Sequence, residues 1–112
     1  MLFKPVHVPM ILSGRKTETR RGWKRPMVKV GGLYQAQTAL YKPDTVFAHL
    51  RVLHMWKEQL YYITDRSIYN EGYDTRSAYY EVYREINRIP LSRWDPSQVV
   101  TAIRFRLEDK NG

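Results

Sequence analysis

The densest cluster of reactive residue types is the segment 14–21, which reads GRKTETRR and holds four cations and two threonine hydroxyls. On a β-strand, Thr19 and Arg21 would point to the same face, because alternate residues of a strand share a face. Lys16 precedes this strand at a bend and can lean toward Thr19. An amine beside a hydroxyl can hold a phosphate, or it can act as a base when neighbouring positive charge lowers its pKa. The alternative is a solvated basic strand edge, whose charges prevent edge-to-edge aggregation.

A single carboxylate, Glu71, is the second candidate for chemistry. It ends the predicted short helix 65–71, which Gly72 closes. A carboxylate there meets the negative end of the helix dipole, which costs roughly a few tenths of a kcal/mol. Because this placement opposes folding, it fits an acid retained for chemistry, although an exposed surface glutamate is the commoner case.

The sequence carries no metal or cofactor motif. It has no cysteine, so it forms neither a disulfide framework nor a thiolate metal site. It also has no phosphate-binding glycine loop, nucleophile elbow or zinc signature. Three histidines have no metal-ligand spacing with any carboxylate and are interpreted as exposed or hydrogen-bonded residues: His7, His49 and His54. We therefore expect neither a metal nor a cofactor.

The chain is strongly basic for its size. Its 112 residues carry 19 Lys and Arg against 11 Asp and Glu, a formal net charge of +8. A surplus of this size attracts polyanions, which favours nucleic acid as a partner. Nine tyrosines and three tryptophans lie among these cations, and flat rings beside cations suit base stacking as well as an ordinary core. No apolar run is long enough for a signal peptide or a membrane span, so we expect a cytoplasmic protein without a membrane partner.

Residue patterns predict the elements that position these side chains. Proline and glycine bracket a short helix over 8–14, and the apolar positions of 75–87 recur at helical spacing. Alternating residues over 98–108 predict a closing strand. Further strands and a short helix are expected at 17–21, 33–40 and 46–56, and at 65–71. Strands early and late with helices between them favour an α+β barrel over a parallel βαβ sheet.

The segment 11–21 resembles the signature of ASCH domains, which are relatives of the PUA fold. That signature reads Gly-x-Lys-x-x-Glu-x-Arg, with threonine in place of the glutamate in some branches. Gly14, Lys16 and Arg21 match its fixed positions, and Thr19 occupies the variable acid position.

The likeness continues along nearly the whole chain. The turn 29–32 is similar to the family's Lys-x-Gly-Asp turn, with Gly32 where aspartate is usual. Further segments similar to phage and bacterial members are 60–64, 70–73, 86–87, 94–96 and 102–105. The resemblance implies a single ASCH domain over 1–112, a small PUA-like β-barrel of about five to six mixed strands with about two to three short helices. The last few residues are expected to be disordered.

The resemblance also implies an activity. One branch of the family is known to remove the acyl group from N4-acetylcytidine, using a lysine, a threonine three residues later and a glutamate from the helical insert. Lys16, Thr19 and Glu71 match these positions. By this likeness Thr19 is the nucleophile, Lys16 takes its proton, and Glu71 polarises the amide or passes a proton to the leaving amine. The reaction needs no metal or organic cofactor.

Cationic and aromatic neighbours would bind the modified nucleoside or RNA: Arg15, Arg20, Arg21 and Tyr73. Arg21 would orient the substrate or stabilise developing charge. Other members of the family are described as ribonucleases or RNA binders, so two alternatives stay open. One is a non-enzymatic RNA-binding module, which needs the cations but not Glu71, and the other is a metal-independent ribonuclease.

Overall fold

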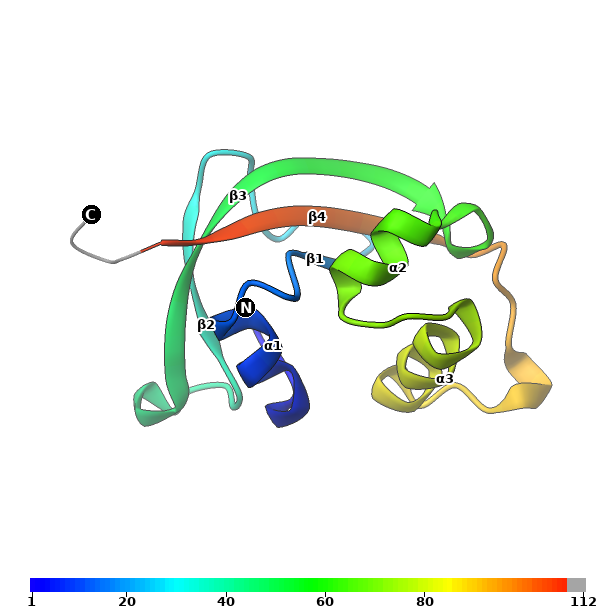
Figure 1. The fold of residues 1–112 in the computed structure, drawn as a ribbon, viewed down its shortest axis with the longest axis horizontal. Helices are drawn as coiled ribbons and strands as arrows, with labels where there is room; N and C mark the ends of the chain where they lie inside the picture. The colour runs from blue at the N-terminus through cyan, green and yellow to red at the C-terminus, as the bar shows by residue number, and fades with distance from the viewer. Residues whose placement is uncertain (109–112) are drawn as a thin grey trace.

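Four antiparallel strands form one curled sheet in the order β1-β4-β3-β2 (Figure 1). The computed structural model describes residues 1–108. The strands are β1 (Glu18–Arg21), β2 (Leu33–Gln37), β3 (Val46–Gln59) and β4 (Val99–Glu108). The helices are α1 (Val8–Leu12), α2 (Asp65–Glu71) and α3 (Arg76–Asn87). Figure 1 shows these helices below the arching strands, with α1 under one end of the sheet and α2 and α3 under the other.

The predicted α+β class and its helices are confirmed, but the number of strands differs. In the part of the chain that the structure describes, four antiparallel strands replace the five to six mixed strands expected. The segment between β1 and β2 contains Pro26 and forms bends, and near the N-terminus Leu2 makes only an isolated parallel bridge to Gln37. β2 also ends earlier than predicted, at Gln37, where its pairing with β3 becomes irregular, and the chain then turns at Tyr41, which has a φ of 59°. The tail 109–112 lies outside the described residues.

No helix within residues 1–108 combines the length and the apolar character that crossing a membrane requires.

β1 lies at the edge of the sheet and pairs with β4, where Glu18 is opposite Arg104. The predicted alternation of its side chains is confirmed by their contacts. Arg21 Nε donates to Thr19 Oγ1 at 3.1 Å on one face, and Arg20 Nη1 donates to Glu18 Oε1 at 3.0 Å on the other. The side chains of Thr19 and Glu18 therefore lie in different environments.

Side-chain caps determine where α2 and α3 begin. Thr64 Oγ1 accepts a hydrogen bond from the Ser67 amide at 3.1 Å, and Thr75 caps α3 in the same way. α2 ends at Gly72, whose φ of 108° is left-handed and favours glycine. Glu71 is therefore the last residue of α2, as the sequence predicts.

Two buried clusters fill the space between the sheet and the helices. The cluster next to α1 consists of Phe3, Ile11, Ala36, Ala48, Leu50 and Phe105. The cluster next to α2 and α3 consists of Leu60, Ile63, Ile68, Tyr79, Tyr83 and Val100. Each set of helices has its own cluster, so α1 and the α2–α3 pair pack against the sheet separately, on either side of β1 (Figure 1).

Candidate active site

A cavity of about 230 Å³ lies between the N-terminal segment that precedes α1, strand β1 and the α2–α3 pair. Six of the seven residues predicted for the site line this cavity: Lys16, Thr19, Arg20, Arg21, Glu71 and Tyr73. Its volume is below the ~300–1,000 Å³ of typical small-molecule sites. The cavity therefore suits a group about the size of one nucleobase and its substituent, and an RNA segment would have to extend outside it.

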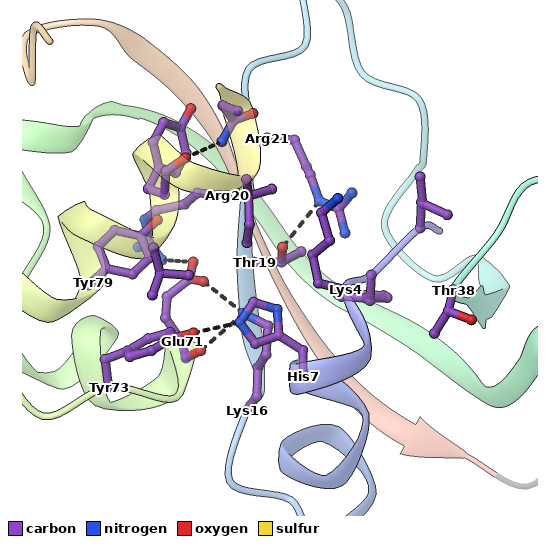
Figure 2. A pocket seen from close by; sticks show the side chains of 16 residues that line it. Lys4, His7, Lys16, Thr19, Arg20, Arg21, Thr38, Glu71, Tyr73 and Tyr79 are labelled. Atoms are coloured by element: carbon purple, nitrogen blue, oxygen red, sulfur yellow. Dashed lines mark hydrogen bonds and ion pairs between the residues drawn. The ribbon is translucent and has the colours of Figure 1, made fainter. Parts of the chain in front are cut away.

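The cavity has two unlike walls (Figure 2). Glu71 and Tyr73 lie on one wall, Lys4 and Arg21 lie on the opposite wall, and Thr19 on β1 lies between them. No group of three or more His, Asp or Glu side chains within residues 1–108 is arranged to hold a metal ion.

Lys16 and Glu71 form a buried ion pair at the base of the cavity. Lys16 Nζ donates to Glu71 Oε1 at 2.8 Å and to the backbone carbonyls of Glu71 and Glu18 at 3.1 and 2.9 Å. The two residues are only 2% and 3% exposed. Burial lowers the pKa of Lys16, and repulsion from Arg21 and Arg20 adds to this effect, while Glu71 opposes it.

The guanidinium of Arg20 is ion-paired with carboxylates. Its fully buried guanidinium lies 2.9 Å from Glu71 Oε2, 3.0 Å from Glu18 Oε1 and 2.6 Å from Glu58 Oε1. Burial opposes the charge, but attraction to Glu71 and Glu58 raises the pKa of Arg20 above its usual value. A role in binding RNA or substrate was predicted for Arg20, but the structure has its guanidinium holding the Glu71 carboxylate in place.

Thr19 is hydrogen bonded to Arg21. Arg21 Nε donates to Thr19 Oγ1 at 3.1 Å, and the Arg21 guanidinium lies 4.8 Å from the centre of the Phe3 ring. Within residues 1–108, Lys16 makes no hydrogen bond to Thr19. Because Thr19 Oγ1 accepts from Arg21, its hydroxyl proton remains free to be donated to a base.

His7 belongs to the cavity, although its spacing in the sequence predicts no such role. Its Nε2 lies 2.7 Å from the Tyr73 hydroxyl. Burial lowers the pKa of His7 to about 4, helped by the positive charges of Lys16 and Arg21. Burial and the negative charge of Glu71 raise the pKa of Tyr73. The His7–Tyr73 pair is therefore uncharged at neutral pH.

Tyrosines of α3 extend the wall that holds Glu71. The Tyr79 ring lies 6.2 Å from both the Tyr73 and the Tyr83 rings, measured between centroids. Burial raises the pKa of Tyr79 well above 10 and that of Tyr83 to about 12. Helical spacing identifies Tyr79 and Tyr83 as core residues, which they are. Their second role as a cavity wall depends on how α3 packs against β1, and no local pattern encodes that packing.

Arg15 is the predicted site residue that the structure does not bring to the cavity. Its Nη2 pairs with Asp74 at 3.2 Å, and its guanidinium lies 3.6 Å over the Tyr69 ring. Arg15 also donates to the Tyr69 carbonyl. Arg15 therefore ties the segment before β1 to α2.

Solved structures of ASCH domains have a similar fold. The ASCH domain from Lactobacillus crispatus matches with a TM-score of 0.70 and 16% identity, over 91% of this chain and 70% of that one. ASCH from Zymomonas mobilis matches with a TM-score of 0.64 and 15% identity, over 97% and 65% of the two chains. Protein EF3133 from Enterococcus faecalis matches with a TM-score of 0.68 and 15% identity, over 91% and 69%. No family model matches the sequence, and no curated protein matches it significantly.

At these identities the likeness concerns the backbone. It extends over at least 91% of the chain in each of the three comparisons, so it includes the sheet and the helices that enclose the cavity. The signature residues of segment 14–21 lie on β1 and at the bend before it, next to the cavity. The chain therefore has the fold of an ASCH domain, as its sequence predicts.

Proposed function

We propose that this domain hydrolyses the amide of an N4-acylated cytosine nucleoside, as its sequence resemblance to the amidohydrolase branch implies. The observation that carries the proposal is the meeting of Lys16, Thr19 and Glu71 at one small cavity, with Lys16 and Glu71 paired at 2.8 Å. A hydroxyl, an amine and a carboxyl group supply the nucleophile, base and acid that amide hydrolysis needs.

In this proposal Lys16 becomes a base by passing a proton to Glu71. A proton shift along its hydrogen bond converts the ion pair into a neutral amine and a carboxylic acid. Burial lowers the pKa of Lys16 and so favours this transfer, whereas Arg20, 2.9 Å from Glu71 Oε2, opposes it. Lys16 then accepts the hydroxyl proton of Thr19 as Thr19 Oγ1 attacks the acyl carbon. Arg21 already contacts that oxygen, and its positive charge stabilises the oxyanion that forms.

Glu71 completes the first half of the reaction. As the carbon–nitrogen bond breaks, the cytosine amine leaves with the proton of Glu71, and the acyl group stays on Thr19 as an ester. Water then attacks the ester and gives a proton to Glu71. Lys16 returns its proton to Thr19 Oγ1, which releases the carboxylic acid and restores the neutral pair.

The aromatic wall supports a nucleobase as the leaving part of the substrate. Tyr73 and Tyr79 lie on the same side of the cavity as Glu71 (Figure 2). Tyrosine rings provide flat faces against which a nucleobase can pack. A cytosine ring against this wall would have its exocyclic nitrogen near the Glu71 carboxyl group.

Incubation with N4-acetylcytidine, followed by chromatography, tests the proposal. We expect cytidine from the wild type and none from Thr19→Ala. Thr17→Ala is the matched control, because Thr17 has the same side chain on neighbouring backbone but does not line the cavity. If no N4-acylcytidine is hydrolysed, the proposal is wrong. Titration of labelled single-stranded RNA at low and moderate salt then tests the binding module, whose affinity should fall steeply with salt.

A further inference from the structure

The wall opposite Glu71 contains the guanidinium of Arg21, whose hydrogen-bond donors are only partly satisfied by the protein. Arg21 donates its Nε–H to Thr19, and its Nη groups have no acceptor within residues 1–108. In the same part of the chain no carboxylate forms an ion pair with Arg21. Arg21 lines the cavity, and neither Nη atom is among the fully buried unpaired atoms, so each retains some exposed surface. Four N–H donors are therefore available to a ligand.

The orientation of this guanidinium is determined by two contacts. The Phe3 ring lies against its face at 4.8 Å, and Phe3 is itself buried. The Nε side is held by the hydrogen bond to Thr19. The outer edge of the guanidinium, with both Nη atoms, is left for a ligand. This planar edge fits the two oxygens of a carboxylate or a phosphate.

A second cation lies on the same wall. Lys4 lines the cavity beside Arg21 in Figure 2, and it has no ion pair among the described residues. The positive charge at this end of the cavity is therefore not neutralised by the protein, in contrast to the carboxylate-bound Arg20.

The position of the Arg21 guanidinium relative to Thr19 and Glu71 indicates which part of a substrate it would contact. Arg21 Nε contacts the oxygen that attacks the acyl carbon, whereas Glu71 serves the leaving amine on the other side. The free Nη edge therefore faces the acyl part of the substrate. A phosphate on the sugar would lie beyond the cytosine, on the amine side.

We propose that the acyl group removed at this site ends in a carboxylate, as malonyl and succinyl groups do, and that Arg21 binds this carboxylate with Lys4 at the cavity mouth. This inference rests on the proposed function and specifies its substrate. The acyl chain extends from Thr19 toward Arg21, and the nucleoside extends from Thr19 toward the tyrosine wall.

The test compares kcat/KM for N4-succinylcytidine, N4-acetylcytidine and N4-acetylcytidine 5′-monophosphate. We expect the wild type to prefer the succinyl over the acetyl substrate by about tenfold or more, the scale of a charge-assisted hydrogen bond. The ratio should fall close to one in Arg21→Gln. Arg93→Gln is the matched control, because Arg93 is exposed and lies outside the cavity, and it should keep the wild-type ratio.

A second variant covers the case in which Arg21→Gln does not fold. Lys4→Gln removes a cation from an exposed residue and leaves the Arg21–Thr19 hydrogen bond intact. It should also reduce the succinyl-to-acetyl ratio. The ratio is the readout because Arg21 also contacts the nucleophile, so its substitution lowers the rate with every substrate.

The outcomes separate this inference from the proposed function. Equal kcat/KM for the acetyl and succinyl substrates overturns the inference and leaves the proposed function intact. A preference for the monophosphate alone also overturns it, because the anion is then on the sugar. If no substrate is hydrolysed, the proposed function is wrong, and calorimetric titration with succinamate decides the inference. Binding that is lost in Arg21→Gln supports a carboxylate site, and absence of binding overturns it.

Discussion

Lys16 Nζ lies 2.8 Å from Glu71 Oε1, although the two residues are 55 positions apart in the chain. Lys16 precedes β1, and Glu71 is the last residue of α2. A helix C-terminus repels a carboxylate, so Glu71 depends on the nearby cations for its stability there. The same contacts give Lys16 a proton acceptor within a buried cavity.

Replacing Glu71 by glutamine should remove the acid while keeping the shape of the side chain. We expect deacylation of N4-acetylcytidine to fall by ~100-fold or more, the usual scale for loss of a general acid–base group. Glu81→Gln is the control, because Glu81 is exposed on α3 and does not line the cavity. Steady-state kinetics of both variants, with unfolding temperatures, provide the check. A Glu71→Gln variant with wild-type kcat/KM would remove Glu71 from the mechanism.

Arg20 should matter for stability more than any surface arginine. Arg20→Gln leaves Glu18 and Glu71 buried without their guanidinium partner, which costs about 3–5 kcal/mol for a buried ion pair. Arg104→Gln removes a half-exposed partner that lies 3.4 Å from Glu18, and it should cost less than ~1 kcal/mol. Urea unfolding of the two variants measures the difference. Equal losses of unfolding free energy would contradict the central location assigned to Arg20.

His7 should make stability depend on pH. Burial, with repulsion from Lys16 and Arg21, lowers the pKa of His7 to about 4, from about 6.5 in an unfolded chain. The unfolded chain therefore binds a proton at His7 before the folded protein does. The free energy of unfolding should fall as pH decreases from about 6.5 toward about 4, by at most about 1.4 kcal/mol per pH unit.

The variant His7→Gln isolates this contribution, because glutamine can still hydrogen bond to Tyr73 but does not titrate. Urea unfolding at about pH 7 and about pH 5 should show a smaller loss of stability in the variant than in the wild type. The same loss in both proteins would mean that other groups cause the pH dependence.

An added side chain at Gly72 should destabilise the protein. Its φ of 108° is unfavourable for other residues, and an added Cβ would lie 2.7 Å from Met10 Sδ. We expect Gly72→Ala to lower the free energy of unfolding by about 1–2 kcal/mol for the backbone alone, and further through the contact with Met10. Gly14→Ala is the control, because Gly14 also has a positive φ but has open space around it. If the two variants lose equal stability, the close approach of Met10 has no energetic effect.

Local patterns predict most of the fold. The helix 65–71 has a threonine cap and a closing glycine, and β4 has clear alternation, so each is specified by neighbouring residues. The number of strands was predicted less well. Bends around Pro26 and the isolated bridge of Leu2 depend on contacts between distant segments, which a single sequence does not reveal.

The candidate site is likewise predictable from the sequence only in part. Thr19 and Arg21 were placed on one face because strand geometry alone requires it. The same alternation puts Arg20 on the opposite face from Arg21, but it does not show that three carboxylates bind Arg20 or that Asp74 binds Arg15. Which cation remains free is decided by partners from other elements. His7 joins the site for a similar reason, since its partner Tyr73 is 66 residues away.

The central claim is that the acyl group passes through a covalent ester on Thr19, and peptide mass spectrometry tests it most directly. The protein is mixed with N4-acetylcytidine, quenched in acid during the first turnover, digested and analysed. We predict one acetyl group on the peptide that contains Thr19 in the wild type and in Thr17→Ala, and none in Thr19→Ala. Release of cytidine with no acetyl group on that peptide at any sampled time, or continued turnover by Thr19→Ala, would contradict the account.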